Sequence, residues 1–110
     1  MAMANSFHKI VTYVPKTHAK VVREAIGKAG AGKIGNYSFC SFSSQGIGRF
    51  LPGKGASPAI GKVGKLEEVP EERIEVTCAS HLVGDVIKAI KTAHPYEEPV
   101  IDHWPINIAN

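Results

Sequence analysis

The densest group of side chains able to do chemistry lies near the end of the chain, in the run His-Pro-Tyr-Glu-Glu-Pro at positions 94–99. This run places the imidazole of His94 close to the carboxylates of Glu97 and Glu98, and His103 follows a few residues later. Imidazole and carboxylate groups suit zinc, copper or another first-row divalent metal. The two glutamates could also act as acid and base, so a small metal-dependent hydrolase is one hypothesis.

A structural interpretation of the same run competes with the metal site and is the one we favour. Nothing in it has the spacing of a helical metal motif such as H-E-x-x-H. The two prolines force the chain out of a helix and into an extended strand. Tyr96 would then pack at this corner or at an interface, and the carboxylates would accept amide hydrogen bonds. Alternation along the strand puts Asp102 and His103 on opposite faces, so not all these groups can share one ion.

A second candidate site is basic and rich in glycine. No Asp or Glu occurs between Glu24 and Glu67, an interval with six lysines and arginines, and nine of the eleven glycines lie between residues 30 and 64. Such a segment attracts anions or an acidic partner, although a solvated loop has the same composition. The candidate anion ligands are Arg49, Lys54, Lys62 and Lys65. Residues 48–54 spell G-x-x-x-x-G-K, but Gly55 stands where a phosphate-binding loop needs Ser or Thr.

Two similar units of strand and helix must position these residues. Residues 9–14 predict a buried strand, and Thr17 can cap a following helix. The pattern returns 64 positions later with a strand at 73–78 and a helix capped by Ser80. In the first helix the apolar face comprises Val21, Val22, Ala25, Ile26 and Ala29. At the offset of 64, the last four match Val86, Ala89, Ile90 and Ala93 of the second helix, and Ile10 matches Ile74.

A further strand closes each unit, at 37–43 and at 100–104. Two β-α-β units predict an α+β fold of the ferredoxin-like, split βαβ type, with both helices on one face of the sheet. Between the units, residues 44–72 form an inserted hairpin or loop segment. Within it we expect a turn at Ser44 and Gln45, a return strand at 46–51, and an extended piece at 65–69 before Pro70.

Length and composition indicate one domain over residues 1–110, with a core from about 8 to 105. A sheet of this size gains from self-association. Cys40 and Cys78 are too far apart in sequence for a zinc ribbon or a redox motif, so we expect reduced thiols. Neither a leader nor a membrane helix is recognisable, which makes the cytoplasm the default location. We expect no membrane partner and no nucleic-acid partner.

Three separated motifs resemble one known family. The run GAGKIGNYSFCSFSSQGIGRFLPGKGASPAIG at 30–61, GKLEEVPEERIEV at 64–76 and AHPYEEPVID at 93–102 look like the domain inserted in Nif-three-like dinuclear-metal proteins. These proteins are also called GTP cyclohydrolase type 2 homologues. The HPYEEP stretch resembles the H-x-Y-E-x-P segment of the cation-tolerance protein CutA. The resemblance implies a PII/CutA-like fold that closes into a homotrimer.

What the resemblance implies for function is narrower. The dinuclear site of such proteins lies in flanking domains, so their hydrolase activity does not transfer to this chain. Similarity to CutA makes His94, Tyr96 and Glu97 a candidate metal-linked or intersubunit site, and similarity to PII makes 46–64 a candidate ligand-sensing loop. The leading expectation is a non-catalytic, trimeric binding or regulatory module that senses a divalent metal or small anion, or docks on a protein partner. A secreted or interaction effector is a further alternative.

Overall fold

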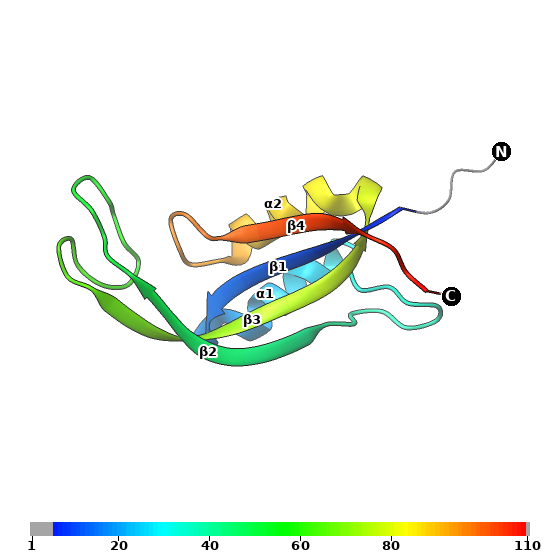
Figure 1. Cartoon of the computed structure of the whole chain (residues 1–110), viewed down its shortest axis with the longest axis horizontal. Helices are drawn as coiled ribbons and strands as arrows, with labels where there is room; N and C mark the ends of the chain where they lie inside the picture. Colours follow the sequence, from blue (N-terminus) through cyan, green and yellow to red (C-terminus); the bar gives the residue numbers. More distant parts are fainter. Residues whose placement is uncertain (1–5, 110) are drawn as a thin grey trace.

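The computed structural model describes residues 6–109 as four strands and two helices (Figure 1). A short 3-10 turn precedes each helix, at Lys16–His18 and at Ser80–Leu82. In chain order the elements are β1 (Phe7–Pro15), α1 (Ala19–Lys28), β2 (Phe42–Phe50), β3 (Glu67–Ala79), α2 (Val83–Ala93) and β4 (Ile101–Ile106).

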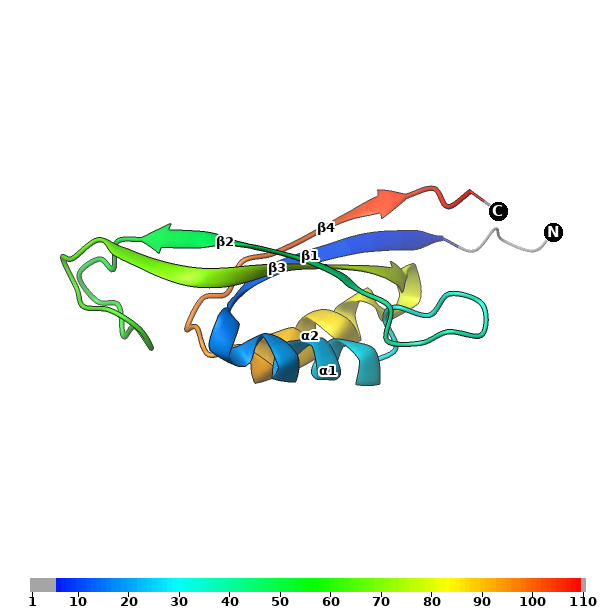
Figure 2. The ribbon, with the colours of Figure 1, turned by 90° about the horizontal axis from the view of Figure 1, so that it is seen from below.

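The strands form one antiparallel sheet in the order β2-β3-β1-β4, and both helices cover one of its faces (Figure 2). This arrangement confirms the predicted α+β, ferredoxin-like fold. The opposite face of the sheet carries no helix. Among residues 6–109, neither helix has the length and apolar character needed to cross a lipid bilayer.

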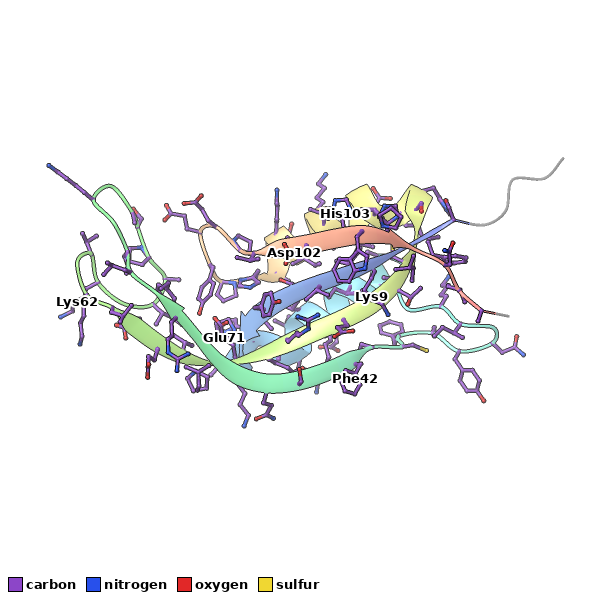
Figure 3. The ribbon with its side chains drawn as sticks, in the orientation of Figure 1. Lys9, Phe42, Lys62, Glu71, Asp102 and His103 are labelled. Atoms are coloured by element: carbon purple, nitrogen blue, oxygen red, sulfur yellow. The ribbon has the colours of Figure 1, made fainter. Side chains whose placement is uncertain are left out.

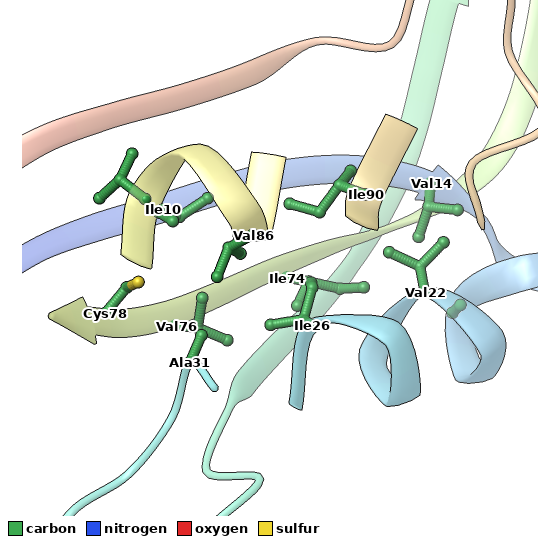
Figure 4. Close-up of a cluster of buried hydrophobic side chains, with 12 residues drawn as sticks. Ile10, Val14, Val22, Ile26, Ala31, Ile74, Val76, Cys78, Val86 and Ile90 are labelled. Carbon is green, nitrogen blue, oxygen red and sulfur yellow. The ribbon is translucent and has the colours of Figure 1, made fainter. Parts of the chain in front are cut away.

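The core fills the space between the sheet and the helices (Figure 4). The residues that match at the 64-residue offset occupy equivalent places in it, because each unit must bury one strand face and one helix stripe. Three of the matching pairs are at most 3% exposed: Ile10 and Ile74, Val22 and Val86, Ile26 and Ile90. Val21 was predicted on the same stripe, but it is 48% exposed because it lies to the side of the contact.

The two predicted helix caps are wrong. Helix α1 begins only at Ala19 and α2 only at Val83, after the 3-10 turns, and no side chain caps either helix. The Thr17 hydroxyl lies 2.9 Å from His18 Nδ1, and Ser80 Oγ lies 2.8 Å from His8 Nδ1. Because the 3-10 turn places both hydroxyls upstream of the first helical turn, they cannot reach its free amides.

The prediction of a strand at 37–43 and a turn at Ser44 and Gln45 is also wrong. Residues Phe42–Phe50 form one uninterrupted strand, paired with β3 from Phe42 opposite Glu75 to Phe50 opposite Glu67. A two-residue hairpin turn needs positive φ, and Phe39 is the only non-glycine residue within 6–109 that has it. Residues 37–41 instead belong to the loop before β2, in which Ile34 bridges Tyr37 and the Cys40 amide donates a hydrogen bond of 2.9 Å to the Gly32 carbonyl.

Strand β3 is longer than predicted and runs through Pro70. Strand β3 pairs with β1 only from Ala79 to Glu71, so at Pro70 its single neighbour is β2. On the side away from β2 no strand within residues 6–109 accepts a backbone hydrogen bond, so a proline, which has no N–H group, is tolerated there. Beyond that point β2 and β3 project as a two-stranded arm (Figure 1). We call residues 51–66, which join the two strands at its end, the arm loop. The arm accounts for the elongated shape of 55 × 23 × 21 Å.

Candidate functional site

The connection between α2 and β4, residues 94–100, forms a corner that His94 fixes to the end of β1. His94 ends α2 with extended backbone angles, as the following proline requires, and its side chain is only 6% exposed. Its Nε2 lies 2.7 Å from the carbonyl oxygen of Tyr13, and its Nδ1 accepts a hydrogen bond from the Tyr96 amide at 3.1 Å. This network assigns the proton to Nε2.

The buried setting of His94 also favours its neutral form. Burial lowers the pKa of the imidazole below 6.5, and the bond to the Tyr13 carbonyl and the charge of Glu71 only partly oppose this effect. Both ring nitrogens therefore hold backbone groups in a neutral, structural arrangement. A metal at His94 would have to displace one of these bonds.

Tyr96 reaches from the corner to the base of the arm. Its hydroxyl donates a hydrogen bond of 2.7 Å to Glu71 Oε2, and its ring meets the Phe50 ring edge-on with the centroids 5.6 Å apart. Burial first, and then the hydrogen bond and charge of Glu71, raise the pKa of the phenol. Tyr96 thus remains a protonated donor that links the α2–β4 corner to β2 and β3.

The two glutamates of the corner are exposed, but one of them contacts the arm loop. Glu97 Oε1 accepts a hydrogen bond of 3.1 Å from the backbone amide of Ser57. Glu98 lies beside it on the exposed side of the corner. The glycine-rich segment and the HPYEEP run, which the sequence presents as two separate candidate sites, therefore meet through this bond.

A cleft of about 500 Å³ lies where the arm loop faces the corner. Most of its walls are apolar, and Glu71, Glu97 and Glu98 add carboxylates. The hydrophobic and aromatic walls come from β1, β2, the arm loop and the corner: Tyr13, Phe50, Pro52, Ala59, Tyr96 and Val100. A mainly apolar cavity of this size with a few converging polar groups is typical of small-molecule sites.

Gly48 lets the Glu71 carboxylate occupy the cleft wall. A Cβ atom at Gly48 would clash with that carboxylate, and Gly48 itself lines the cleft. Tyr13, Phe50 and Glu71 were all missed as site residues. Tyr13 and Phe50 lie at or near the ends of β1 and β2, which is an indirect signal in the sequence, whereas Glu71 lies inside β3 and has none.

The other predicted site residues lie away from the cleft or are already paired. His103, on β4, packs against His8 with the ring centroids 5.4 Å apart. Within residues 6–109, no three His, Cys, Asp or Glu side chains gather closely enough to hold a metal ion. The structure thus brings Glu97 and Glu98 together and leaves His103 apart. Metal binding by His94, Glu97, Glu98 and His103 stays a prediction.

The basic residues follow the arm rather than converging on one point. Arg49 lines the cleft, and its Nε donates a hydrogen bond of 2.8 Å to Glu68 Oε2. Lys54, Lys62 and Lys65 are exposed on the arm loop and do not line the cleft. Figure 3 shows Lys62 at the outer end of the arm, well beyond Glu71 at its base.

Comparison with curated proteins finds close relatives over most of this chain. Two proteins named "GTP cyclohydrolase 1 type 2 homolog" are each 50% identical to it, over 101 residues in Halalkalibacterium halodurans and 98 residues in Bacillus subtilis. The matches cover 92% and 89% of this chain but 27% and 26% of those proteins. The chain thus spans about a quarter of the length of these relatives. No family model matches it.

Among solved structures, too, a longer protein matches this chain along part of its length. A Bacillus cereus protein related to NIF3 is 48% identical, with a TM-score of 0.84 over 97% of this chain and 27% of its own. The CutA protein of Archaeoglobus fulgidus (19% identity, TM-score 0.68, 94% and 87% coverage) and the GlnK protein of B. subtilis (15%, 0.63, 96% and 85%) share the fold. The chain therefore corresponds to about a quarter of the NIF3-related GTP cyclohydrolase 1 type 2 homologs and has a PII/CutA-like fold.

Proposed function

We propose that this chain is a non-catalytic binding and regulatory module that takes a small ligand in the cleft between the arm loop and the α2–β4 corner. One observation carries the proposal: two segments about forty residues apart in sequence converge on a single, mainly apolar cavity. Its volume of about 500 Å³ falls in the range of ligand sites. The carboxylates at its wall supply groups that orient a ligand.

The architecture of the arm supports a regulatory response to that ligand. Beyond Pro70 the arm has no third strand beside it, and the bond from Ser57 to Glu97 is exposed. A ligand in the cleft contacts both the arm loop and the corner, so it favours one position of the arm over others. A partner protein that reads the position of the arm would then sense whether the cleft is filled.

We also propose that the module works as a homotrimer, as the PII/CutA-like fold implies. No helix covers the sheet face opposite α1 and α2, and large apolar side chains on that face are exposed. Phe42 is 67% and Trp104 is 42% exposed, and the strand register places both on this face. Burying such side chains between copies is favourable at roughly 25 cal/mol per Å² of apolar surface.

The remaining ligand hypotheses need more than one copy of the chain or a different part of it. A divalent metal would draw Glu97 and Glu98 from neighbouring subunits, because both nitrogens of His94 are hydrogen-bonded in the single chain. A small anion would bind along the arm at Lys54, Lys62 and Lys65, outside the cleft. The cleft gathers more convergent groups than either alternative does, so we place the ligand there. The cytoplasmic location likewise stays a prediction.

Filling the cleft with a large side chain tests the proposal. Ala59 lines the cleft and is exposed, so we expect Ala59→Trp to occupy the cavity without disturbing the core. Ala109→Trp, near the end of the chain and outside the cleft, is the matched control. A fragment library is screened by ligand-observed NMR against all three proteins. We expect fragments that bind the wild type and the control to lose binding to Ala59→Trp. Fragments that bind all three proteins equally would contradict the proposal.

A further inference from the structure

The charge of the cleft is opposite to that of the segment that forms its outer wall. Three carboxylates line it, from Glu71, Glu97 and Glu98. Among residues 6–109, the one basic residue that lines the cleft is Arg49, and its guanidinium is already hydrogen-bonded to Glu68. The lysines of the arm loop extend into solvent. The lining of the cleft therefore carries more negative than positive charge, although residues 25–66 as a whole are basic.

Aromatic rings form part of the same cavity. Tyr13 comes from β1, Phe50 from β2 and Tyr96 from the corner, so three separate elements each bring one ring to the cleft. The face of an aromatic ring carries partial negative charge and attracts cations within about 6 Å of its centroid. The aromatic rings and the carboxylates of the cleft therefore both favour a cationic ligand group.

The chain itself already places a cation against one of these rings. The guanidinium carbon of Arg73 lies 5.7 Å from the centroid of the Tyr13 ring, and Arg73 Nη1 donates a hydrogen bond of 2.9 Å to the Tyr13 hydroxyl. Arg73 lies beside the cleft and does not line it. The Tyr13 ring, which forms part of the cleft wall, therefore already contacts the guanidinium group of Arg73.

The Glu71 carboxylate is held in the cleft wall, where it can bind a positively charged ligand group. Tyr96 donates a hydrogen bond to its Oε2, and the missing side chain of Gly48 leaves space for its Oε1. The phenol of Tyr96 donates without bringing positive charge, so the negative charge of Glu71 is not neutralised by this bond. Glu97, across the cleft on the corner, accepts only the neutral amide of Ser57 among the described residues.

We infer that the cleft binds a small organic cation, an ammonium ion with an apolar body. The ammonium group lies at the carboxylates of Glu71 and Glu97, and the apolar body packs against the rings of Phe50 and Tyr96. This inference rests on the proposed function, because it names the chemical class of the ligand for the same site. It assigns the site to an amine rather than to an anion.

Three probes of one shape and different charge test the inference. The ¹⁵N-labelled protein is titrated with 2-phenylethylammonium, with the uncharged 2-phenylethanol and with the anion phenylacetate, and backbone amide shifts are followed by NMR. We expect the ammonium probe to shift amides of residues 51–60 and 96–100, with a Kd at least about tenfold below that of the alcohol. Phenylacetate should bind most weakly.

Charge removal and added salt keep the test independent of folding effects. In Glu71→Gln/Glu97→Gln we expect the preference for the ammonium probe over the alcohol to fall to within about twofold, whereas Glu24→Gln, on α1, should retain it. The amide spectrum of each variant reports whether it is folded. For the wild type, raising the salt concentration from 0.05 to 0.5 M should weaken binding of the ammonium probe and leave the alcohol unchanged, because salt screens charge.

The outcomes separate the inference from the proposed function. If phenylethanol or phenylacetate binds in the cleft as tightly as the ammonium probe, the cleft is a ligand site but the cation assignment is wrong. An unchanged preference in the double variant would also overturn that assignment. If none of the three probes shifts the cleft amides at millimolar concentration, the assignment and the proposed cleft function both fail.

Discussion

Tyr96 is the side chain on which the geometry of the cleft most depends, because it joins the corner to the base of the arm. Its hydroxyl holds Glu71, and its ring packs against Phe50. We expect Tyr96→Phe to keep the ring contact and to lose the hydrogen bond. The free energy of unfolding at pH 8, measured by urea denaturation, should fall by about 1 kcal/mol, the usual net value of one such bond.

The pH dependence of that difference provides a second check. Folding raises the pKa of Tyr96 above its ordinary value of 10.0, so the folded state favours the protonated phenol. This stabilisation is complete below about pH 10 and is lost as pH rises further. The stability difference between the wild type and Tyr96→Phe should therefore shrink between pH 8 and pH 11. A difference that stays constant over this range would show that the phenol is not held as described.

At the residue scale, the sequence shows which side chains are reactive but not which of them meet. The HPYEEP run identifies Glu97 and Tyr96 by type alone. Glu71 cannot be found in this way, because it lies in an acidic, strand-like stretch in which every second residue faces outward. Its role depends on the Tyr96 hydroxyl and on the absence of a side chain at Gly48, two long-range features that leave no local pattern.

At the scale of elements, the loop before β2 is fixed to α1 by one aromatic ring. Phe39 has a φ of 60°, rare for a residue with a bulky side chain, and its ring lies where a Cβ on Gly27 would be. Alanine is normally about 1 kcal/mol better than glycine inside a helix. We expect Gly27→Ala, made alone, not to stabilise the protein by this amount, because the new methyl group displaces the Phe39 ring.

A double-mutant cycle measures this coupling. In a Phe39→Gly background the space is free, so Gly27→Ala should stabilise the protein by up to about 1 kcal/mol. Gly84→Ala on α2 is the matched control, since a Cβ there meets nothing within 4 Å and the substitution should not depend on Phe39. Chemical denaturation of the four cycle members and the control gives the result. Additivity at Gly27 and Phe39 would contradict the packing described.

The strands and helices that pack on the core could be predicted from sequence, whereas β2 and the arm, which extend away from the core, could not. The periodic burial of β1, α1, β3 and α2 appears as a repeat of apolar residues at a fixed offset. Strand β2 lacks that signal because it is an edge strand with mostly exposed side chains. The sequence therefore predicts a short hairpin or loop within residues 44–72. In the structure, β2 pairs with β3 from Glu67 to Glu75.

At the scale of the whole molecule, the open face of the sheet is the proposed contact between subunits. Native mass spectrometry should give a species of three times the 11.8 kDa chain mass. Trp104→Glu places a charge on the open face and should shift the population to monomers. His103→Glu is the control, because the neighbouring side chain on β4 faces the other side. A monomeric wild type, or a trimer indifferent to Trp104→Glu, would contradict the proposed assembly.

The same spectra, recorded before and after treatment with a chelator, examine the predicted metal site. A retained mass that the chelator removes would support ligands shared between subunits at Glu97 and Glu98.

The fold could be predicted at this scale because topology follows from the order of strands and helices. The cleft could not, because it arises only when the arm loop approaches the corner, and the bond from Ser57 to Glu97 spans 40 residues.

A crystal structure of the protein with a fragment that binds the wild type but not Ala59→Trp tests the central claim most directly. We expect the fragment to lie in the cleft, between the arm loop and the corner, with its apolar part against Phe50 and Tyr96. A fragment found on the open face of the sheet or along the lysines of the arm, with the cleft empty, would contradict it.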